Sequence, residues 1–289
     1  MALPYDPLIG AVSPVTPVDI SSCGLRLQSL IGGGGYGEVF EAMDSKGSKF
    51  AVKVFRSEKC RIKGVSALPT HGVREICALM ELRHPHVLRL FAVVAAPRGN
   101  DFSLGKNHRS LWLVTELCTT DLARSNRRVT QRITFGTPGF GSCPRFGLNL
   151  HLIQQFSFQI LLGLKYCHER GVVHRDIKPS NVLLNHESAS IRIADFGTAR
   201  RFRRGEPRTP EVCTTWYRAP GLLLGDLQYT HKADIWSVGC IVGEMICGYP
   251  LFPGENEIDT LYHIFQMLGF PSGAERVYFS KLPFFSVGP

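Results

Sequence analysis

The sequence predicts an α+β fold built as two lobes, a small β-rich lobe followed by a larger, mainly helical one. Short strand-like runs at 39–42, 50–53 and 111–114 lie in the first part of the chain, and runs with helical spacing, around 153–164 and 258–268, lie in the rest. A chain of 289 residues with 44% hydrophobic residues can form a core in one large domain or in two lobes. We expect a flexible proline-rich extension over 1–24, the small lobe over 25–115, a hinge over 116–120 and the large lobe over 121–289.

A glycine-rich run opens the small lobe. Residues 32–39 have the pattern Gly-x-Gly-x-x-Gly-x-Val, and residues 39–42 alternate like a strand that leads into a turn at 44–47. A dinucleotide-binding fingerprint would lead from a strand into a helix, so these glycines are expected to cap a hairpin. Backbone without side chains can lie close over nucleotide phosphates, and the strand over 50–53 then offers Lys53 to them.

The next predicted element is a helix over 73–82, which has apolar residues close to helical spacing. It places Glu75 where its carboxylate can pair with Lys53. Gly72 costs a helix interior about 1 kcal/mol relative to alanine. We therefore expect a helix whose first turn is poorly self-supporting and is ordered by a docking partner.

A strand over 111–114 is expected to lead into the hinge. Thr115 would then lie at the back of an adenine pocket, which its small side chain leaves roomy. Glu116 and Cys118 would offer backbone hydrogen bonds to the base.

The most informative run is His174-Arg175-Asp176-Ile177-Lys178-Pro179-Ser180-Asn181, followed by Asp195-Phe196-Gly197. Phosphoryl transfer requires that the nucleophile is positioned and that negative charge is neutralised. Asp176 suits the acceptor of a hydroxyl proton, Lys178 can steady the moving phosphoryl group, and Asn181 with Asp195 can hold magnesium. Strands predicted at 172–173, 182–184 and 191–194 leave these polar groups on strand ends and loops.

The large lobe is predicted to be mainly helical. One helix contains Ile153, Phe156, Ile160 and Leu164, and another runs through Gly239 and Glu244. A third, amphipathic helix is expected around Ile258, Leu261, Tyr262, Phe265 and Leu268, before an irregular tail with Phe279, Phe284 and Phe285. Pro97–Arg109 and Arg124–Gly147 read as surface loops of tolerated insertions.

Composition limits the function classes. The nine cysteines have no Cys-x-x-Cys pair, which favours reduced, mostly buried thiols over a disulfide framework. The +9 net charge is dispersed except for a cluster at residues 200–204, which favours a phosphate-pairing loop over a nucleic-acid-binding face. No apolar run is long enough to span a bilayer, and the proline-bearing start does not resemble a signal peptide. We expect a protein of the cytoplasm, the nucleus or both, with no membrane and no direct nucleic-acid contact.

Taken together, these motifs resemble the cyclin-dependent kinases, a group of serine/threonine protein kinases, over about residues 27–271. The runs Leu68–Ile76 and His84–Leu88 look like their cyclin-contacting helix and its sequel. Trp216–Pro220, Asp234–Cys240 and Phe252–Asp259 are similar to the same group. The resemblance implies the bilobal protein kinase fold, ATP and Mg²⁺ as cofactors, protein substrates and a cyclin-like activating subunit.

The resemblance also assigns site residues. It implies that Lys53, Glu75, Asp176, Lys178 and Thr214 are catalytic and that Asn181 and Asp195 hold the metal. Thr214 is typical of serine/threonine kinases, and Arg218 is associated with preference for proline after the phosphorylated residue. Thr209 matches the activating phosphothreonine, Arg74, Arg175 and Arg200 match the arginines that clasp it, and Tyr36 resembles an inhibitory phosphotyrosine. The implied nucleotide-contacting residues are Ile31, Gly32, Gly34, Gly37, Val39, Ala51, Lys53, Thr115, Glu116, Cys118, Asp121 and Leu183.

The sequence departs from this group at three places. Gly35 replaces the threonine neighbour of Tyr36, and Gly221 replaces the glutamate of an Ala-Pro-Glu motif. The large lobe is expected to lack its last helices, which would leave apolar helix surface exposed.

The leading interpretation is a proline-directed serine/threonine kinase that depends on ATP, magnesium, a cyclin-like partner and phosphorylation of Thr209. The alternative is a catalytically impaired kinase-like module that binds a cyclin or competes with full-length kinases. A nucleic-acid-binding protein is a third reading, with little support in the sequence.

Overall fold

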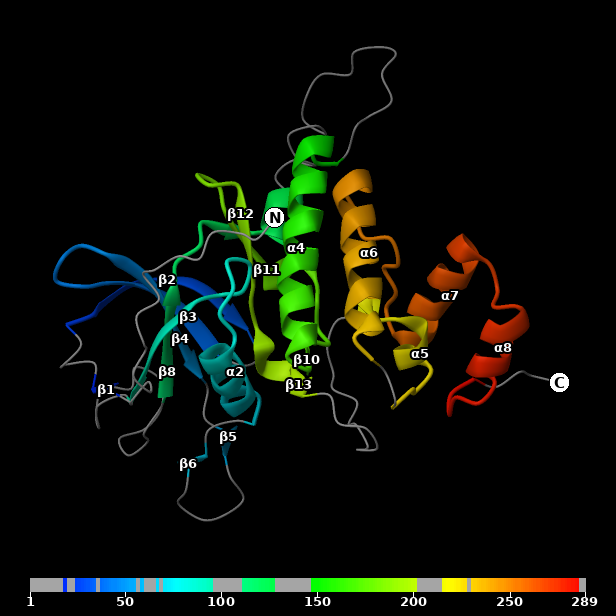
Figure 1. Cartoon of the computed structure of the whole chain (residues 1–289), viewed down its shortest axis with the longest axis horizontal. Helices are drawn as coiled ribbons and strands as arrows, with labels where there is room; N and C mark the ends of the chain where they lie inside the picture. Colours follow the sequence, from blue (N-terminus) through cyan, green and yellow to red (C-terminus); the bar gives the residue numbers. More distant parts are fainter. Residues whose placement is uncertain are drawn as a thin grey trace, which may run out of the picture. The chain divides into compact units, whose positions relative to one another are not determined.

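The structure is a computed structural model of the chain. It describes residues 18–19, 24–34, 37–55, 58–59, 66–67, 70–95, 111–127, 147–201, 215–227 and 230–285 (Figure 1). The chain divides into two compact units, of which the first contains Met1–Glu81 and Arg89–Leu117 and the second Leu82–Leu88 and Cys118–Pro289. The division after Leu117 falls within the range 116–120, while residues 82–88 group with the second unit.

The first unit contains a six-stranded sheet with the order β1-β7-β8-β4-β3-β2. Neighbouring strands are antiparallel except for β1 and β7, which are parallel. The strands are β1 (Val18–Asp19), β2 (Arg26–Gly34), β3 (Gly37–Met43), β4 (Lys49–Phe55), β7 (Leu90–Ala95) and β8 (Leu111–Glu116), with β5 (Glu58–Lys59) and β6 (Ser66–Ala67) paired separately. The strands predicted over 39–42, 50–53 and 111–114 are therefore present.

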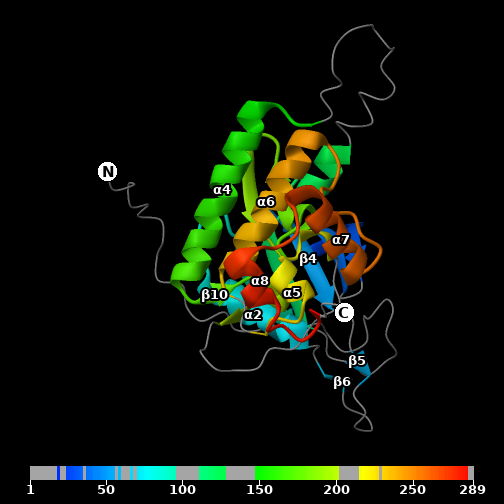
Figure 2. The ribbon, with the colours of Figure 1, turned by 90° about the vertical axis from the view of Figure 1, so that its right-hand side faces the viewer.

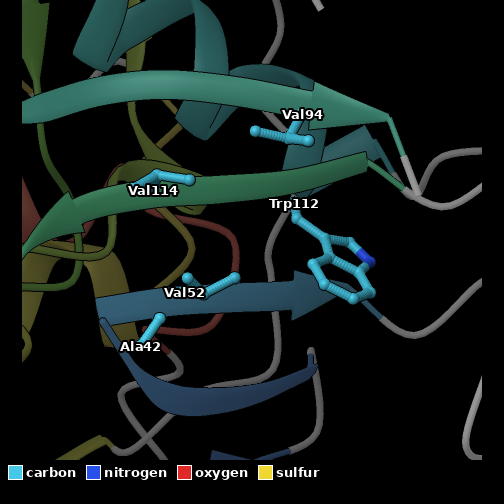
Figure 3. Packing of buried hydrophobic residues seen from close by; sticks show 5 residues of the cluster. All are labelled: Ala42, Val52, Val94, Trp112 and Val114. Atoms are coloured by element: carbon cyan, nitrogen blue, oxygen red, sulfur yellow. The ribbon is translucent and has the colours of Figure 1, made fainter. Parts of the chain in front are cut away.

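The two faces of this sheet have different roles. Successive side chains of a strand point to opposite faces. One face carries a buried cluster of Ala42, Val52, Val94, Trp112 and Val114 (Figure 3). The residues between them in sequence, such as Lys53 and Leu113, are paired across β4 and β8 and lie on the other face. Alternation thus separates the apolar core from the face that carries the lysine.

Helix α2 (Thr70–Glu81) confirms the helix predicted over 73–82 and begins three residues earlier. It buries Gly72, Glu75 and Leu79. A Cβ atom on Gly72 would lie 3.2 Å from the ring of Phe55, a fully buried side chain of β4. Gly72 is therefore more than a weak point in the first turn, because its missing side chain lets α2 approach the sheet.

The second unit is mainly helical, and this confirms the predicted α+β class. Helices α4 and α6 run side by side in both views (Figures 1 and 2). Ile153, Phe156, Ile160 and Leu164 are buried on α4, as their spacing predicted. The helices are α4 (Leu150–Glu169), α5 (Pro220–Leu223), α6 (Lys232–Cys247), α7 (Glu257–Leu268) and α8 (Gly273–Phe279), with a further helical segment over 122–127.

Short strands and 3-10 turns in the second unit carry the polar motifs. Antiparallel β11 pairs with both β12 and β9, and β10 pairs with β13. The predicted strands at 172–173, 182–184 and 191–194 are present, with ends shifted by one residue at most. The elements are β9 (Thr120–Asp121), β10 (Val172–Val173), β11 (Val182–Asn185), β12 (Ser190–Ile193), β13 (Arg200–Arg201) and the turns η1 (Pro179–Asn181), η2 (Phe196–Thr198) and η3 (Thr215–Tyr217).

Helix α7 leaves much of its apolar side exposed. Thr260 and Ile264 are its buried residues, while Ile258 is 80% and Tyr262 61% exposed. The expectation of apolar helix surface in this part of the chain is thus met. Within the described residues, no helix has the length and apolar character needed to cross a membrane.

Candidate active site

Asp176 stands at the centre of a polar cluster in the second unit. Its Oδ2 atom accepts a hydrogen bond from Lys178 Nζ at 2.7 Å and one from the amide of Asn181 at 3.1 Å. The same amide donates to the backbone oxygen of Asp176 at 2.8 Å. Asp176 is buried with only 8% exposed, so its carboxylate is held in a fixed orientation. The loop between β10 and β11 therefore brings three of the predicted catalytic and metal-binding residues together.

A buried carboxylate from helix α6 fixes the start of this loop. The two oxygens of Asp234 accept the backbone N–H groups of His174 at 2.9 Å and Arg175 at 2.8 Å. Asp234 also lies 2.8 Å from His168 Nε2 on α4 and is 1% exposed. A carboxylate that accepts several hydrogen bonds is a strong anchor in a buried setting.

The loop is also tied to the Asp195-Phe196-Gly197 segment. His174 Nε2 lies 2.9 Å from the backbone oxygen of Ala194, and its ring packs on Phe196 with centroids 4.7 Å apart. Arg175 Nε donates to Thr198 O at 2.6 Å, and Thr198 Oγ1 donates to His174 O at 2.9 Å. The two motifs therefore form one hydrogen-bonded network.

Two non-glycine residues of this network have left-handed backbone conformations. Arg175 has φ of 71° and Asp195 has φ of 63°. Such conformations cost of order 1–3 kcal/mol and persist only where the surroundings determine them. At Arg175, the contacts of Asp234 with Arg175 N and of Thr198 with Arg175 Nε supply this support.

The donor set at Asn181 and Asp195 suits magnesium. Asn181 uses its amide nitrogen toward Asp176, which leaves its amide oxygen as a ligand atom. Magnesium prefers oxygen ligands and is usually held by one or two protein groups together with water and phosphate oxygens. No group of three or more His, Cys, Asp or Glu side chains in the described part of the chain could hold a metal ion. One carboxylate and one amide oxygen fit an ion that keeps most of its ligands from elsewhere.

The first unit carries its own set of charged groups. Lys53 Nζ lies 2.6 Å from Glu75 Oε2, and Glu75 is only 2% exposed. The lysine comes from β4 and the glutamate from α2, so this ion pair joins the helix to the sheet. Lys53 also lies 5.5 Å above the ring of Phe55, the side chain that packs on Gly72. The pairing expected from the sequence is present.

The glycine-rich run forms the predicted hairpin between β2 and β3. Gly34 pairs with Gly37 next to its tip, and Val39 pairs with both Gly32 and Lys53. A Cβ on Gly37 would lie 2.2 Å from the backbone oxygen of Val54, so no side chain fits there. Gly35 and Tyr36 at the tip lie outside the described residues.

The other implied nucleotide contacts fall on both units. In the first unit, Ile31 lies on β2, Ala51 pairs with Thr115 across β4 and β8, and Glu116 ends β8. Thr115 is buried, and its hydroxyl lies 3.4 Å from Ala51 O.

In the second unit, Asp121 pairs with Leu183 across β9 and β11, and Cys118 precedes β9. The Asp121 carboxylate accepts Arg124 N at 2.8 Å and lies 3.2 Å from Arg124 Nε. It thus caps the helical segment over 122–127.

The regulatory residues are described only in part. Arg200 on β13 pairs with Val173 on β10, and Arg175 follows two residues after Val173 in the loop beyond β10. Arg74 lies on α2 in the first unit. Tyr36, Thr209 and Thr214 lie outside the described residues, as do 97–109 and most of 124–147.

A pocket beside Asp176 reaches the segment that follows η3. It is lined by Asp176, Tyr217, Arg218 and Leu222, among others. Arg218 Nη1 lies 3.2 Å from Glu257 Oε1 at the start of α7. The Arg218 guanidinium next to the pocket is thereby held by Glu257 of α7.

Two positioning groups were not singled out as site residues from the sequence. From the sequence, Asp234 was named only as the first residue of the run Asp234–Cys240. Glu244 was named only as a residue of a predicted helix. In the structure it is buried, and its carboxylate accepts hydrogen bonds from Tyr217 Oη at 2.5 Å and from Asn126 Nδ2 at 3.2 Å. Burial and the neighbouring carboxylate raise the pKa of Tyr217 well above its usual range. An acidic residue at a core position of an apolar helix is the signal that could have identified both.

The described cysteines do not form part of the polar cluster around Asp176. Five are described as free, of which Cys167 and Cys240 are buried and Cys77 is exposed. Burial raises the pKa of the Cys167 thiol and of the Cys240 thiol to about 12, which makes them poor nucleophiles at neutral pH.

A comparison with known families identifies the fold that these contacts belong to. The family model described as "Protein kinase domain" matches residues 25–277, which is most of the chain. The match includes both units, with the Lys53–Glu75 pair in one and the Asp176 loop in the other. The antiparallel sheet and the helical region agree with the bilobal α+β architecture of that family. This chain therefore belongs to the protein kinase family, whose members transfer phosphate to protein substrates.

Proposed function

We propose that this chain is an ATP- and magnesium-dependent serine/threonine kinase that prefers sites followed by proline. The observation that carries the proposal is the Asp176 carboxylate held by Lys178 and Asn181, on a loop that Asp234 fixes. These groups and the Lys53–Glu75 pair are charged groups of the kind that phosphoryl transfer requires.

The proposed chemistry follows from the placement of these groups. Asp176 accepts the proton of a substrate hydroxyl, whose oxygen then bonds to the γ-phosphorus of ATP while the bond to ADP breaks. Lys178 neutralises charge on the transferred group, and Lys53 binds the remaining phosphates. Asn181 and Asp195 would hold magnesium, which would neutralise phosphate charge there.

Preference for proline is proposed from Arg218. This residue lines the pocket beside Asp176, and its guanidinium lies 3.2 Å from Glu257 Oε1, which supports a role for it next to the phosphoacceptor. The serine/threonine assignment rests on the resemblance at Thr214.

A cyclin-like partner is proposed to bind helix α2. Val73, Cys77 and Met80 have helical spacing and are all exposed, whereas Glu75 and Leu79 are buried. An exposed, largely apolar stripe opposite the Glu75 side suits a hydrophobic partner that orders the helix and with it the Lys53–Glu75 pair.

A peptide phosphorylation assay with ATP and magnesium tests this proposal. Peptides that contain Ser-Pro, Ser-Ala or Tyr-Pro are compared with and without a panel of cyclins. We expect transfer to Ser-Pro to exceed the other two and to rise with one cyclin, and we expect Met80→Glu to lose only the rise. Equal transfer to Ser-Pro and Tyr-Pro, or stimulation that Met80→Glu leaves intact, would contradict the assignment.

A further inference from the structure

The segment that follows helix α5 is held by residues from the end of the described chain. Tyr278 on α8 donates its hydroxyl hydrogen to Asp226 Oδ2 at 2.5 Å. Phe284 donates its backbone N–H to Leu224 O at 3.1 Å. Figure 2 shows α8 close to α5. Two contacts six residues apart in sequence thus join residues 273–285 to residues 220–226.

Gly225 is shaped for this contact. Its φ of 86° lies in the left-handed region, which glycine adopts without steric cost. A Cβ on Gly225 would lie 2.8 Å from two ring carbons of Phe284, and the backbone N–H of Phe284 bonds to the neighbouring Leu224 O. The Phe284 ring therefore lies directly on the turn.

Gly221 leaves room for the other contact. A Cβ at this position would lie 3.6 Å from Tyr278 Oη and 3.8 Å from Asp226 Oδ2, and Gly221 O accepts Asp226 N at 2.8 Å. A longer acidic side chain at residue 221 would bring a second carboxylate toward Asp226. The glycine that departs from the kinase pattern is therefore compatible with the Tyr278–Asp226 hydrogen bond.

The held segment forms part of the wall beside Asp176. Leu222 and Arg218 line the pocket that contains Asp176. The residues just before the segment are fixed by Trp216 Nε1, which donates to Gly254 O at 2.6 Å, and by the Tyr217–Glu244 hydrogen bond. The end of the segment, from Leu224 to Asp226, is fixed by Phe284 and Tyr278.

We propose that Tyr278 and Phe284 form a clasp on residues 220–226 that positions the protein substrate beside Asp176. The clasp rests on the proposed kinase function, and both residues are positioning residues. They lie beyond residue 277, the last residue of the family match.

Steady-state kinetics with a Ser-Pro peptide test the role in substrate binding. In Tyr278→Phe, the KM for the peptide is expected to rise by about three- to tenfold, the scale of one ordinary hydrogen bond lost at a partly exposed position. The KM for ATP is expected to stay the same. Asp226→Asn keeps an acceptor oxygen and should shift the peptide KM less. Tyr262→Phe, at an exposed tyrosine of α7, serves as the matched control.

Hydrogen exchange tests the clasp independently of activity. The amides of Leu223 and Asp226, which donate to Ala219 O and Gly221 O, should exchange faster in Tyr278→Phe and in Phe284→Ala than in the unaltered chain. Phe158→Ala on α4 is the control, because Phe158 and Phe284 are similarly exposed. Unchanged exchange would overturn the clasp.

The two proposals fail in different ways. Faster exchange with an unchanged peptide KM would overturn the positioning role. If the unaltered chain transfers no phosphate, the kinase proposal fails, and the clasp is then judged by exchange and by the Kd of a fluorescein-labelled Ser-Pro peptide. A Kd that Tyr278→Phe does not weaken, or no peptide binding by the unaltered chain, would also overturn the positioning role.

Discussion

At the scale of single residues, the position of Asp176 depends on contacts that share one carboxylate oxygen. Lys178 and Asn181 both donate to Oδ2. Among the described residues no hydrogen bond to Oδ1 is found, so this oxygen is open to accept a substrate proton. Asp234 acts one step away, because it binds the backbone before Asp176 rather than its side chain.

Residue 221 allows a prediction from charge alone. Gly221→Glu places a carboxylate near Asp226 Oδ2, whereas Gly221→Gln places a neutral side chain of the same size there. We expect the glutamate variant to unfold with a free energy lower by about 0.5 kcal/mol than the glutamine variant, because like charges repel. Urea denaturation measures the difference, which should shrink in 0.5 M salt. Equal stability of the two variants at low salt would contradict the placement of Asp226.

At the scale of elements, the position of helix α2 depends on a close approach. Gly72→Ala would normally gain about 1 kcal/mol in a helix interior. Here the new methyl group would lie 3.2 Å from the buried Phe55 ring. We therefore expect the free energy of unfolding to fall or stay level. We also expect transferase activity to drop, because the Lys53–Glu75 pair is displaced.

Gly239→Ala is the matched control for this helix. Gly239 lies on an exposed position of α6, and a Cβ there meets no atom within 4 Å. This variant should gain the full helix propensity, which urea denaturation measures. A similar gain from Gly72→Ala would show that Phe55 yields easily. Combining Gly72→Ala with Phe55→Leu should recover part of the loss, because it opens the contact.

The segment Leu82–Leu88 predicts a pH dependence of stability. Burial, and then the nearby charges of His86, Arg170 and Arg192, lower the pKa of His84 below its usual range. Burial is also the main cause that lowers the pKa of His86, with Arg192 adding to it and the contact with Ile191 O opposing it. A histidine with a depressed pKa in the folded state stabilises the fold above about pH 6.5, and this stability is lost as the pH falls through the folded pKa.

The His84→Asn variant tests this dependence. Asparagine can replace His84 Nδ1 as the acceptor of His86 N, but it does not titrate. Between pH 7 and 5, the free energy of unfolding should therefore fall less steeply in His84→Asn than in the unaltered chain. His151→Asn on the exposed start of α4 controls for a general loss of histidine. Parallel slopes for all three proteins would contradict the prediction.

Much of the fold was predictable because the elements of the site follow simple periods. Alternation identified β3, short strand-like runs identified β4 and β8, helical spacing identified α2 and α4, and the Lys53–Glu75 pair followed from these elements together. An acidic residue within an apolar helix could have pointed to Asp234 and Glu244, but the partners of these two residues and the packing of Gly72 on Phe55 were not predictable. They depend on contacts between residues far apart in sequence, which no local pattern encodes.

At the scale of the whole molecule, each unit has its own core and its own part of the catalytic set. The second unit exposes Ile258 and Tyr262 one helical turn apart on α7. We expect the double change of Ile258→Lys and Tyr262→Lys to reduce self-association, because it removes apolar surface. Light scattering over a concentration series measures this, with an unchanged Tm as the control. Identical scattering before and after the change would show that this surface is not adhesive.

Asp176 is proposed to act as the proton acceptor in phosphate transfer by this chain. Transfer of labelled phosphate from ATP to a protein substrate, with magnesium and a cyclin panel, tests it most directly in the unaltered chain and in Asp176→Asn. Because the substitution removes the proton acceptor, we expect activity to fall by at least about a hundredfold while ATP binding is retained. Equal transfer by the two proteins would contradict this role of Asp176.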